Sequence, residues 1–390
     1  MGCTMPHGLL YGASFTKGVL SFTDKQGRTI CNADLWNFLT LTATEDNSSV
    51  KLKMHGTLSN EFEVNVGNGW KGYNFGTVIP LNAGQSCKWR CSAHPTMQSS
   101  SNYVQFVMTG TIEASGNCNS MLSSDFNGIT SLYDYDYAFC SLFQNCSSLT
   151  RAPELPATNL AKFCYQYMFS GCYNLTQAPS LPATNLAKFC YQYMFSNCDN
   201  LTQAPELPAM TLADSCYKFM FYYCHHLTQV PSLPATTLAN YCYQGMFYNC
   251  TSITQSPELP AMTLSNYCYT SMFYGCNHLT QAHELPATTL ADYCYSNMFH
   301  DCTSIMQAPS LPATTLANYC YQSMFSGCSK LKEARISATT TATGALSDWL
   351  NGVAATGNLY CDPNSTIFQT GASGIPKGWT RLPLSDYPTA

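Results

Sequence analysis

Apolar positions in the second half of the chain recur at a fixed spacing of 26 residues. The triplet Leu-Pro-Ala begins seven times at this spacing, at Leu155, Leu181, Leu207, Leu233, Leu259, Leu285 and Leu311. A first cysteine column follows it: Cys164, Cys190, Cys216, Cys242, Cys268, Cys294 and Cys320. A second column consists of Cys172, Cys198, Cys224, Cys250, Cys276, Cys302 and Cys328. A fixed period of this size is typical of a solenoid, in which each coil buries its apolar face against its neighbours.

Within one repeat, the pattern predicts a strand, a corner and a short helix. The apolar run 175–178 is followed by Pro179, which cannot donate to a sheet ladder, so a strand there ends near Ala178. The second half of the repeat places apolar residues at steps of four, as the core-facing stripe of a helix would. In one repeat these residues are Leu290, Cys294, Met298 and Cys302.

The residue before the second cysteine column also fits a helix end. In five of the seven repeats this residue is Gly or Asn, which tolerate the left-handed conformation found there. The position is occupied by Gly171, Asn197, Tyr223, Asn249, Gly275, Asp301 and Gly327. A strict glutamine column, from Gln177 to Gln307 and preceded by Arg151, is interpreted as structural, because stacked amides can hydrogen-bond along a solenoid.

Residues 34–114 follow a different pattern, with short alternating runs separated by turn signals such as 45–47 and 67–69. The runs are 38–43, 50–54, 62–66, 78–81, 87–91 and 104–108. Six strands with this spacing predict a small β-sandwich.

After Cys328 the sequence no longer follows the repeat pattern closely. Residues 343–354 carry Leu346, Trp349, Leu350 and Val353 at helical spacing, which predicts a helix that covers the last coil. The chain is therefore divided into four segments. They are an N-terminal arm or attachment segment (1–32), a β-sandwich domain (33–115), a solenoid (116–342) and a C-terminal cap (343–390).

The repeat resembles the cysteine-containing leucine-rich repeats of the BspA-like type, which occur in surface proteins of gut Bacteroidales and in virus-borne relatives. The resemblance is carried by Met-Phe-x-x-Cys-x-x-Leu-Thr at 168–176 and Leu-Pro-Ala-Thr-x-Leu-Ala at 155–161. It covers about residues 131–342, and the segments 108–116 and 374–379 are similar to the flanks of such proteins. The resemblance implies a binding surface rather than a chemistry. The expected fold class is an α+β repeat, with an N-terminal β-sandwich, a leucine-rich-repeat solenoid and a C-terminal cap.

Composition excludes some functions. Charged residues make up 10% of the chain and the net charge is −5, so the basic surface of a nucleic-acid-binding protein is not expected. No apolar run reaches 18 residues, so no membrane-spanning helix is expected. The start, residues 1–18, lacks the apolar core of a secretory signal. Two explanations are open: a signal lies upstream of Met1, or the protein leaves the cell by a route other than secretion, such as a viral particle assembled in the cytosol.

The 22 cysteines are open to three interpretations. The first is that the repeat cysteines are small buried hydrophobic residues. The second is disulfide bonding between neighbouring coils on oxidation, because column neighbours lie near the lower end of the Cα range for disulfides. The third is metal binding along the columns. We favour the first, and expect no metal and no cofactor.

Chemical motifs are scarce. No phosphate-binding loop, His-Glu-x-x-His or Gly-x-Ser-x-Gly sequence occurs. Cys87, Cys91 and His94 lack a second ligand pair for zinc, and an ordinary strand with two cysteines on one face is the better interpretation. A glycan hydrolase would need two facing carboxylates in a cleft. Its candidates are Glu45, Asp46, Glu61 and Glu63. We expect a protein without enzymatic activity.

Variation between repeats points to a surface. Three columns drift in sequence while the apolar columns stay nearly constant, and they are rich in Tyr, Asn, Ser and His. The candidate ligand-binding residues among them are Tyr167, Tyr193, Tyr222, Tyr248, Tyr274, His300, Tyr173 and His225. Tyrosine offers a rigid amphipathic contact area that suits the recognition of sugars or proteins. Solvent exposure alone also allows such drift.

The leading hypothesis is a virion surface component, a fibre or decoration protein of a phage of gut bacteria. Its arm would bind virion proteins, and its repeats would bind a protein or glycan on a host surface. The alternative is a secreted bacterial cell-surface adhesin of a gut Bacteroidales species. A homo-oligomer is compatible with either hypothesis.

Overall fold

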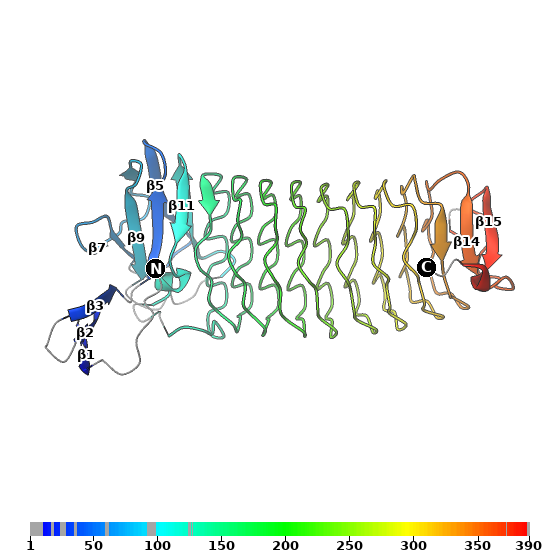
Figure 1. Cartoon of the computed structure of the whole chain (residues 1–390), viewed down its shortest axis with the longest axis horizontal. Coiled ribbons are helices and arrows are strands. Elements are labelled where there is room, and N and C mark those ends of the chain that lie inside the picture. Colours follow the sequence, from blue (N-terminus) through cyan, green and yellow to red (C-terminus); the bar gives the residue numbers. More distant parts are fainter. Residues whose placement is uncertain are drawn as a thin grey trace.

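A computed structural model describes residues 11–16, 19–23, 29–34, 37–58, 62–91, 99–123, 126, 128–371 and 373–387. The chain forms an elongated rod, with a β-sandwich at one end, a stack of coils in the middle and a small sheet at the other end (Figure 1). Much of the predicted arm lies outside the described residues. Within it, β1 (Tyr11–Thr16), β2 (Val19–Thr23) and β3 (Thr29–Asp34) pair as an antiparallel sheet.

The sandwich contains all six strands predicted from the alternating pattern. One sheet has the order β10-β5-β8 and the other β12-β11-β4-β9-β6-β7. Their bounds are β4 Leu39–Ala43, β5 Ser48–His55, β6 Phe62–Asn65, β7 Lys71–Gly72, β8 Ile79–Leu81, β9 Ser86–Cys91, β10 Tyr103–Thr109, β11 Ile112–Ser115 and β12 Leu149–Arg151. The Trp89 ring on β9 lies 5.1 Å from the Phe106 ring on β10, so the two sheets share one core.

The first coil continues the sandwich directly. Strand β12 belongs to this coil and pairs in parallel with β11. The sheet therefore crosses the predicted boundary near residue 115, and the division into four segments remains a prediction. A 3-10 helix, η1 (Cys118–Met121), lies at this junction and is buried.

The predicted helix in each repeat is wrong. The described residues contain no α-helix; the segment forms consecutive tight turns, visible as coils in Figure 1. Every fourth residue has a left-handed backbone, for example Phe163 (φ 58°), Tyr167 (φ 56°) and Gly171 (φ 74°). Two inward residues alternate with two outward residues, so Cys164 and Tyr165 are buried together. The α+β description therefore fits this chain poorly.

Hydrogen bonds explain why the turns replace a helix. The N–H of Tyr165 donates to the carbonyl of Cys190 in the next coil, at 2.9 Å. The N–H of Met168 donates within its own coil, to the carbonyl of Tyr165 at 3.2 Å. Along each turn, backbone N–H groups that donate to the next coil thus alternate with backbone N–H groups that donate within their own coil. These bonds take the place of the i to i−4 ladder of an α-helix.

The same correction applies to the C-terminal segment. Residues 343–352 form turns of the same kind, with Asp348 at φ 53°, and the N–H of Phe325 donates to the carbonyl of Trp349. The predicted cap helix is therefore wrong, although Leu346, Trp349 and Leu350 are buried. The chain ends in β13 (Glu333–Arg335), β14 (Gly357–Cys361), β15 (Trp379–Pro383) and the 3-10 helix η2 (Leu384–Asp386).

The predicted glutamine ladder differs in detail. Backbone bridges join Arg151 to Gln177 and Gln203 to Gln229. The side chains of the column are exposed, and among the described residues no amide of this column bonds to the amide of its neighbour. Backbone bridges, and not side-chain amides, therefore connect the column from coil to coil. The paired segment is short because prolines in the corner that follows cannot donate to a sheet ladder.

Candidate recognition surface

One column of stacked rings on the outward side of the turns runs through Tyr137, Phe163 and Phe189 and, after Ser215, through Tyr241, Tyr267, Tyr293 and Tyr319. Two further columns of aromatic rings lie at the next outward positions of the same coils. In the first of these two columns, Tyr167 stacks on Tyr193 at 5.0 Å and Tyr193 on Phe219 at 4.9 Å between ring centroids. The rings are tilted by only 10° and 17°, because each coil repeats the geometry of the one before it. These residues all have a left-handed backbone.

The second column is formed by the residues three positions later in the same coils. Tyr222, Tyr248, Tyr274 and His300 follow each other at centroid distances of 5.1, 4.5 and 4.5 Å. Tyr222 also packs edge-on against Phe219, at 5.4 Å, and so connects the two columns. We call these seven residues, from Tyr167 to His300, the aromatic strip.

A glycine sets the place where the strip changes column. Gly245 occupies the first-column position after Phe219, and an added Cβ there would lie 2.1 Å from the Phe219 ring. Glycine therefore lets the Phe219 ring lie close to the backbone of the next coil, and it supplies no ring that would continue the column. The column then ends, and the strip continues through Tyr222 and Tyr248. Gly245 and Phe219 were not among the predicted site residues, although both belong to a drifting column.

The environment keeps the tyrosine hydroxyls protonated. Partial burial, followed by the neighbouring Tyr167 and Tyr222, raises the pKa of Tyr193 to about 12. Partial burial and the tyrosines around it likewise raise the pKa of Tyr248 to about 12. The rings bury their faces on each other, so the strip presents ring edges and hydroxyl groups that can donate and accept hydrogen bonds.

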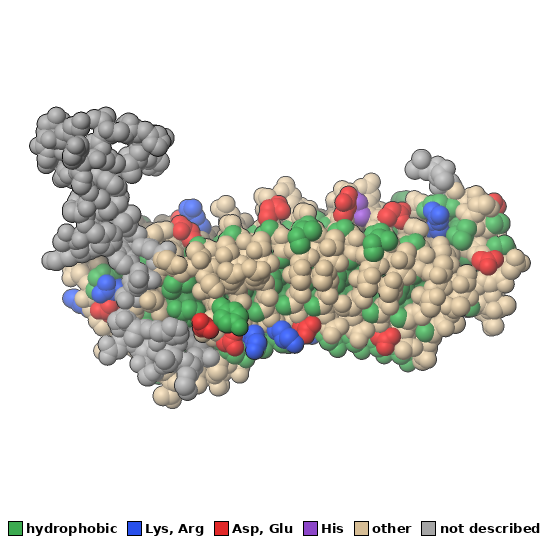
Figure 2. Space-filling model, turned by 90° about the horizontal axis from the view of Figure 1, so that it is seen from below, with side chains coloured by type: hydrophobic (Ala, Val, Ile, Leu, Met, Phe, Trp, Pro, Cys, Tyr) green, Lys and Arg blue, Asp and Glu red, His purple; other side chains and the backbone are tan. Residues whose placement is uncertain are grey.

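Charges at the strip are few. The Lys218 ammonium lies 5.7 Å from the Phe219 ring centroid and 5.2 Å from that of Tyr241, and burial lowers its pKa. His300 Nδ1 lies 3.1 Å from a carboxylate oxygen of Asp301. Figure 2 shows one face of the coils on which uncharged and apolar side chains predominate, with charged side chains along its edges.

The structure brings together seven of the eight predicted ligand-binding residues. Six belong to the strip itself, and His225 reaches it through Tyr223, whose ring centroid lies 5.6 Å from that of His225. His225 Nδ1 is also 2.7 Å from the Asp199 carboxylate. Tyr173 is 51% exposed, and among the described residues its ring contacts no ring of the strip. Tyr173 is therefore exposed but does not belong to the aromatic strip.

The two cysteine columns lie in the core. All fourteen side chains are buried, and burial raises the pKa of each thiol, for example that of Cys224 to about 12. Each thiol of the second column donates to a phenylalanine carbonyl of the preceding coil, as Cys250 does to Phe221 at 3.0 Å. The fourteen cysteines of the two columns form no disulfide.

The candidates for chemistry do not assemble into a site. Glu63 is paired with Arg90 at 2.6 Å, and Asp46 accepts from the Ala83 N–H in an exposed turn that also contains Glu45. Cys87 and Cys91 are buried on the core face of β9, as an ordinary strand requires. Glu61 and His94 lie outside the described residues. In the part of the chain that the structure describes, no three His, Cys, Asp or Glu side chains are placed to share a metal ion.

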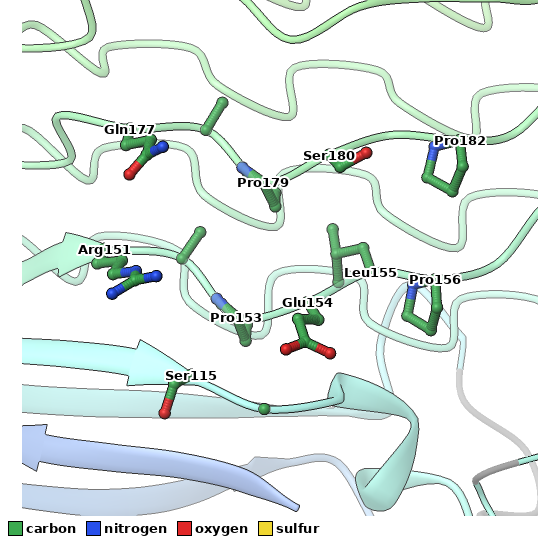
Figure 3. Close-up of a pocket in the computed structure, with 13 residues that line it drawn as sticks. Ser115, Arg151, Pro153, Glu154, Leu155, Pro156, Gln177, Pro179, Ser180 and Pro182 are labelled. Atoms are coloured by element: carbon green, nitrogen blue, oxygen red, sulfur yellow. The ribbon is translucent and has the colours of Figure 1, made fainter. Parts of the chain in front are cut away.

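A shallow pocket of about 380 Å³ lies where the sandwich meets the coils. Figure 3 shows Arg151 and Gln177 at one end, prolines along two neighbouring coils, and Glu154 between Pro153 and Pro156. The Glu154 carboxylate accepts a hydrogen bond from Asn37 at 2.8 Å, so it helps to join the two parts of the molecule.

No helix of the described residues is long and apolar enough to span a membrane.

Comparison with known proteins identifies the family. The family described as BspA type leucine rich repeat region matches residues 117–254 and 246–347, in 6 copies. The chain belongs to this family, which indicates a surface or adhesion-type protein, and leucine-rich repeats in general mediate protein interactions. A solved leucine-rich repeat protein from Bacteroides ovatus is similar at 17% identity and a TM-score of 0.37, over 68% of this chain and 80% of that chain. No curated protein matches.

Proposed function

We propose that this chain is a non-enzymatic recognition and adhesion protein, and that the aromatic strip binds a protein or glycan on a host cell surface. The observation that carries the proposal is the unbroken ring-to-ring path from Tyr167 to His300. Partly exposed rings with protonated hydroxyls combine apolar area with hydrogen bonding at a low cost in conformational entropy. Family membership supports the same conclusion.

We propose further that the protein is displayed on a phage virion, with its N-terminal arm bound to virion proteins. The thiol columns support this setting. The fourteen column cysteines are buried and form no disulfide, and those of the second column donate hydrogen bonds in the core. Such a core is suited to folding in a reducing compartment, as when a virion assembles in the cytosol of its host. The alternative, a bacterial cell-surface adhesin, is supported by the family.

The repeat itself provides substitutions that test the strip. The position of Tyr222, Tyr248 and Tyr274 is serine in other coils, as at Ser170 and Ser196. The triple change of these tyrosines to serine should therefore preserve the coil and remove the second column. We expect binding of fluorescently labelled protein to gut bacterial cells, measured by flow cytometry, to fall about tenfold or more.

A matched control lies elsewhere on the coils. Met210 and Met262 are exposed, and other coils carry threonine at their position. The double variant Met210→Thr/Met262→Thr should bind like the unchanged protein. Equal loss in both variants, or unchanged binding after loss of the tyrosines, would contradict the role of the strip.

The proposed location on a virion is tested by mass spectrometry of density-purified extracellular particles. A fixed ratio of this chain to a capsid protein is expected for a virion component. Recovery of the chain only in the bacterial envelope fraction would replace this proposal with the cellular adhesin.

A further inference from the structure

One position of the repeat, near the C-terminal end of the coils, carries a different residue type from the other repeats. The position two residues after the glutamine column is proline in six of seven repeats, for example Pro257 and Pro309, but it is His283 in one. In the last, decayed repeat, the backbone pairing of Gln307 with Glu333 places Arg335 at the same position. His283 and Arg335 thus lie two coils apart, with Pro309 between them.

The preceding coil is adapted to the histidine. Proline has no N–H, but His283 has one, and it donates to the Ser256 hydroxyl at 2.9 Å. Serine replaces the alanine or valine found at that position in every other repeat. His283 Nδ1 lies 2.5 Å from the Ser256 carbonyl oxygen, which can only accept, so Nδ1 carries the proton. Nε2 therefore accepts from the Gln255 amide, at 3.3 Å.

The arginine is positioned by the C-terminal segment. Its guanidinium carbon lies 4.9 Å from the Tyr387 ring centroid, and the Gln307 amide donates to the Tyr387 hydroxyl. Among the described residues Arg335 makes no ion pair, and its Nε is buried without a hydrogen-bond partner. A planar guanidinium held in this way is suited to binding a carboxylate.

Between these side chains lies a groove of about 660 Å³, within the usual size range of ligand sites. It is also lined by Gln281 and by Glu284, whose carboxylate accepts from the Ser310 N–H at 2.6 Å. The lining combines amide, imidazole, carboxylate and hydroxyl groups with the apolar surface of Ala282, Ala308 and Pro309. Such a lining matches the hydroxyl groups of a sugar better than a peptide, whose anchors require apolar pockets.

We propose that this groove is a second binding site, for an acidic sugar of a glycan chain, with the sugar carboxylate on Arg335. The Gln281 amide and the Glu284 carboxylate then bind the sugar hydroxyls, while His283, held by Ser256 and Gln255, forms one wall of the groove. The site is formed by the proline-containing corner and not by the aromatic strip, so the proposal does not depend on the strip.

The test is calorimetric titration of the full chain with a tetramer of galacturonic acid. The fully methyl-esterified tetramer is the matched ligand without charge. We expect the acid to bind, and the ester to bind at least about tenfold more weakly. The variant Ser256→Ala/His283→Pro restores the residues of the other repeats, so it should fold normally and lose binding of the acid by about tenfold. Arg335→Gln should lose it to a similar extent.

Three results would overturn the proposal: no binding of the acid, equal binding of acid and ester, or full binding by the Ser256→Ala/His283→Pro variant. Equal binding of a tetraglutamate peptide would overturn the assignment to a sugar. The triple serine variant of the strip should bind the acid normally. That result separates a failure of this site from a failure of the proposed function.

Discussion

The sandwich and the coil stack pack their aromatic rings in opposite ways. In the sandwich, Trp89 meets Tyr73 at an interplanar angle of 71° and Phe106 at 76°. In the coils, Phe221 and Phe247 are stacked at 4° and 5.6 Å. Two facing sheets bring side chains together from different directions, which favours edge-to-face contacts. A repeated coil instead places the same side chain in the same orientation each time.

This difference affects how each region is stabilised. Each sandwich contact occurs once, whereas each coil contact recurs in every repeat. The stability of the coil stack is then approximately the sum of similar neighbour terms, and an error affects only adjacent coils. The chemical groups in the columns also recur, so conditions that act on one thiol or one tyrosine act on all of them.

Alkaline pH should give the largest difference between the regions. Burial raises the pKa of the Cys224 thiol from 9.0 to about 12 and that of the Tyr248 hydroxyl from 10.0 to about 12. A raised pKa means that the neutral form is favoured on folding. The stabilisation is complete below pH 9 and is lost as the pH rises through 12. We expect cooperative unfolding of the coils in this range, with the release of tyrosinate absorbance.

The sandwich provides the internal reference for this titration. In a variant with Trp349 and Trp379 replaced by phenylalanine, the remaining tryptophan fluorescence should change at higher pH than the circular dichroism of the coils, because the sandwich contains fewer such groups. Tyrosines that titrate independently near pH 10 while the fold persists would contradict the expectation.

Truncation of one ring in each core should have the next largest effect. Phe247→Ala and Trp89→Ala each leave a cavity and should lower the free energy of unfolding by about 3–5 kcal/mol. Urea denaturation should show a single lowered transition for Trp89→Ala. Phe247→Ala should instead separate the unfolding of the coils on its two sides. A uniform shift of one transition by both variants would show that the two regions unfold as one unit.

Removal of a column thiol should have an intermediate effect. Cys250→Ala deletes a buried sulfur and its hydrogen bond to the Phe221 carbonyl, and should cost about 1–2 kcal/mol. The same change at other second-column positions should cost a similar amount, because the contact recurs. Chemical denaturation of three such variants measures the spread, and large differences among them would argue against additive coils.

Left-handed positions should give the smallest effect. Asn197 (φ 57°) in the coils and Asn47 (φ 59°) in the sandwich share this conformation. Substitution by glycine relieves the strain but increases the entropy of the unfolded chain. We expect changes of about 0.5 kcal/mol in both, with Asn197→Gly the more favourable because other coils already carry glycine there. The midpoint of thermal unfolding measures both.

The incorrect helix shows how far a periodic pattern can be interpreted. Steps of four advance about 40° per step around an ideal helix, so Leu290, Cys294, Met298 and Cys302 would drift away from one face. Two adjacent inward residues, such as Cys294 and Tyr295, were a further signal of turns. Positive φ at the Gly171 position was expected and is observed in all seven repeats, but as the end of a turn and not of a helix.

The sequence by itself determined the repeat length, the buried columns, the sandwich strands and the drifting positions, because each depends on the local order of apolar and polar residues. Only the tertiary structure decided that the repeats form tandem turns, because the decisive hydrogen bonds join residues 25 apart, such as Tyr165 and Cys190. The same is true of the aromatic strip and of the groove between His283 and Arg335. Both depend on which coil lies next to which, and on where the C-terminal segment returns.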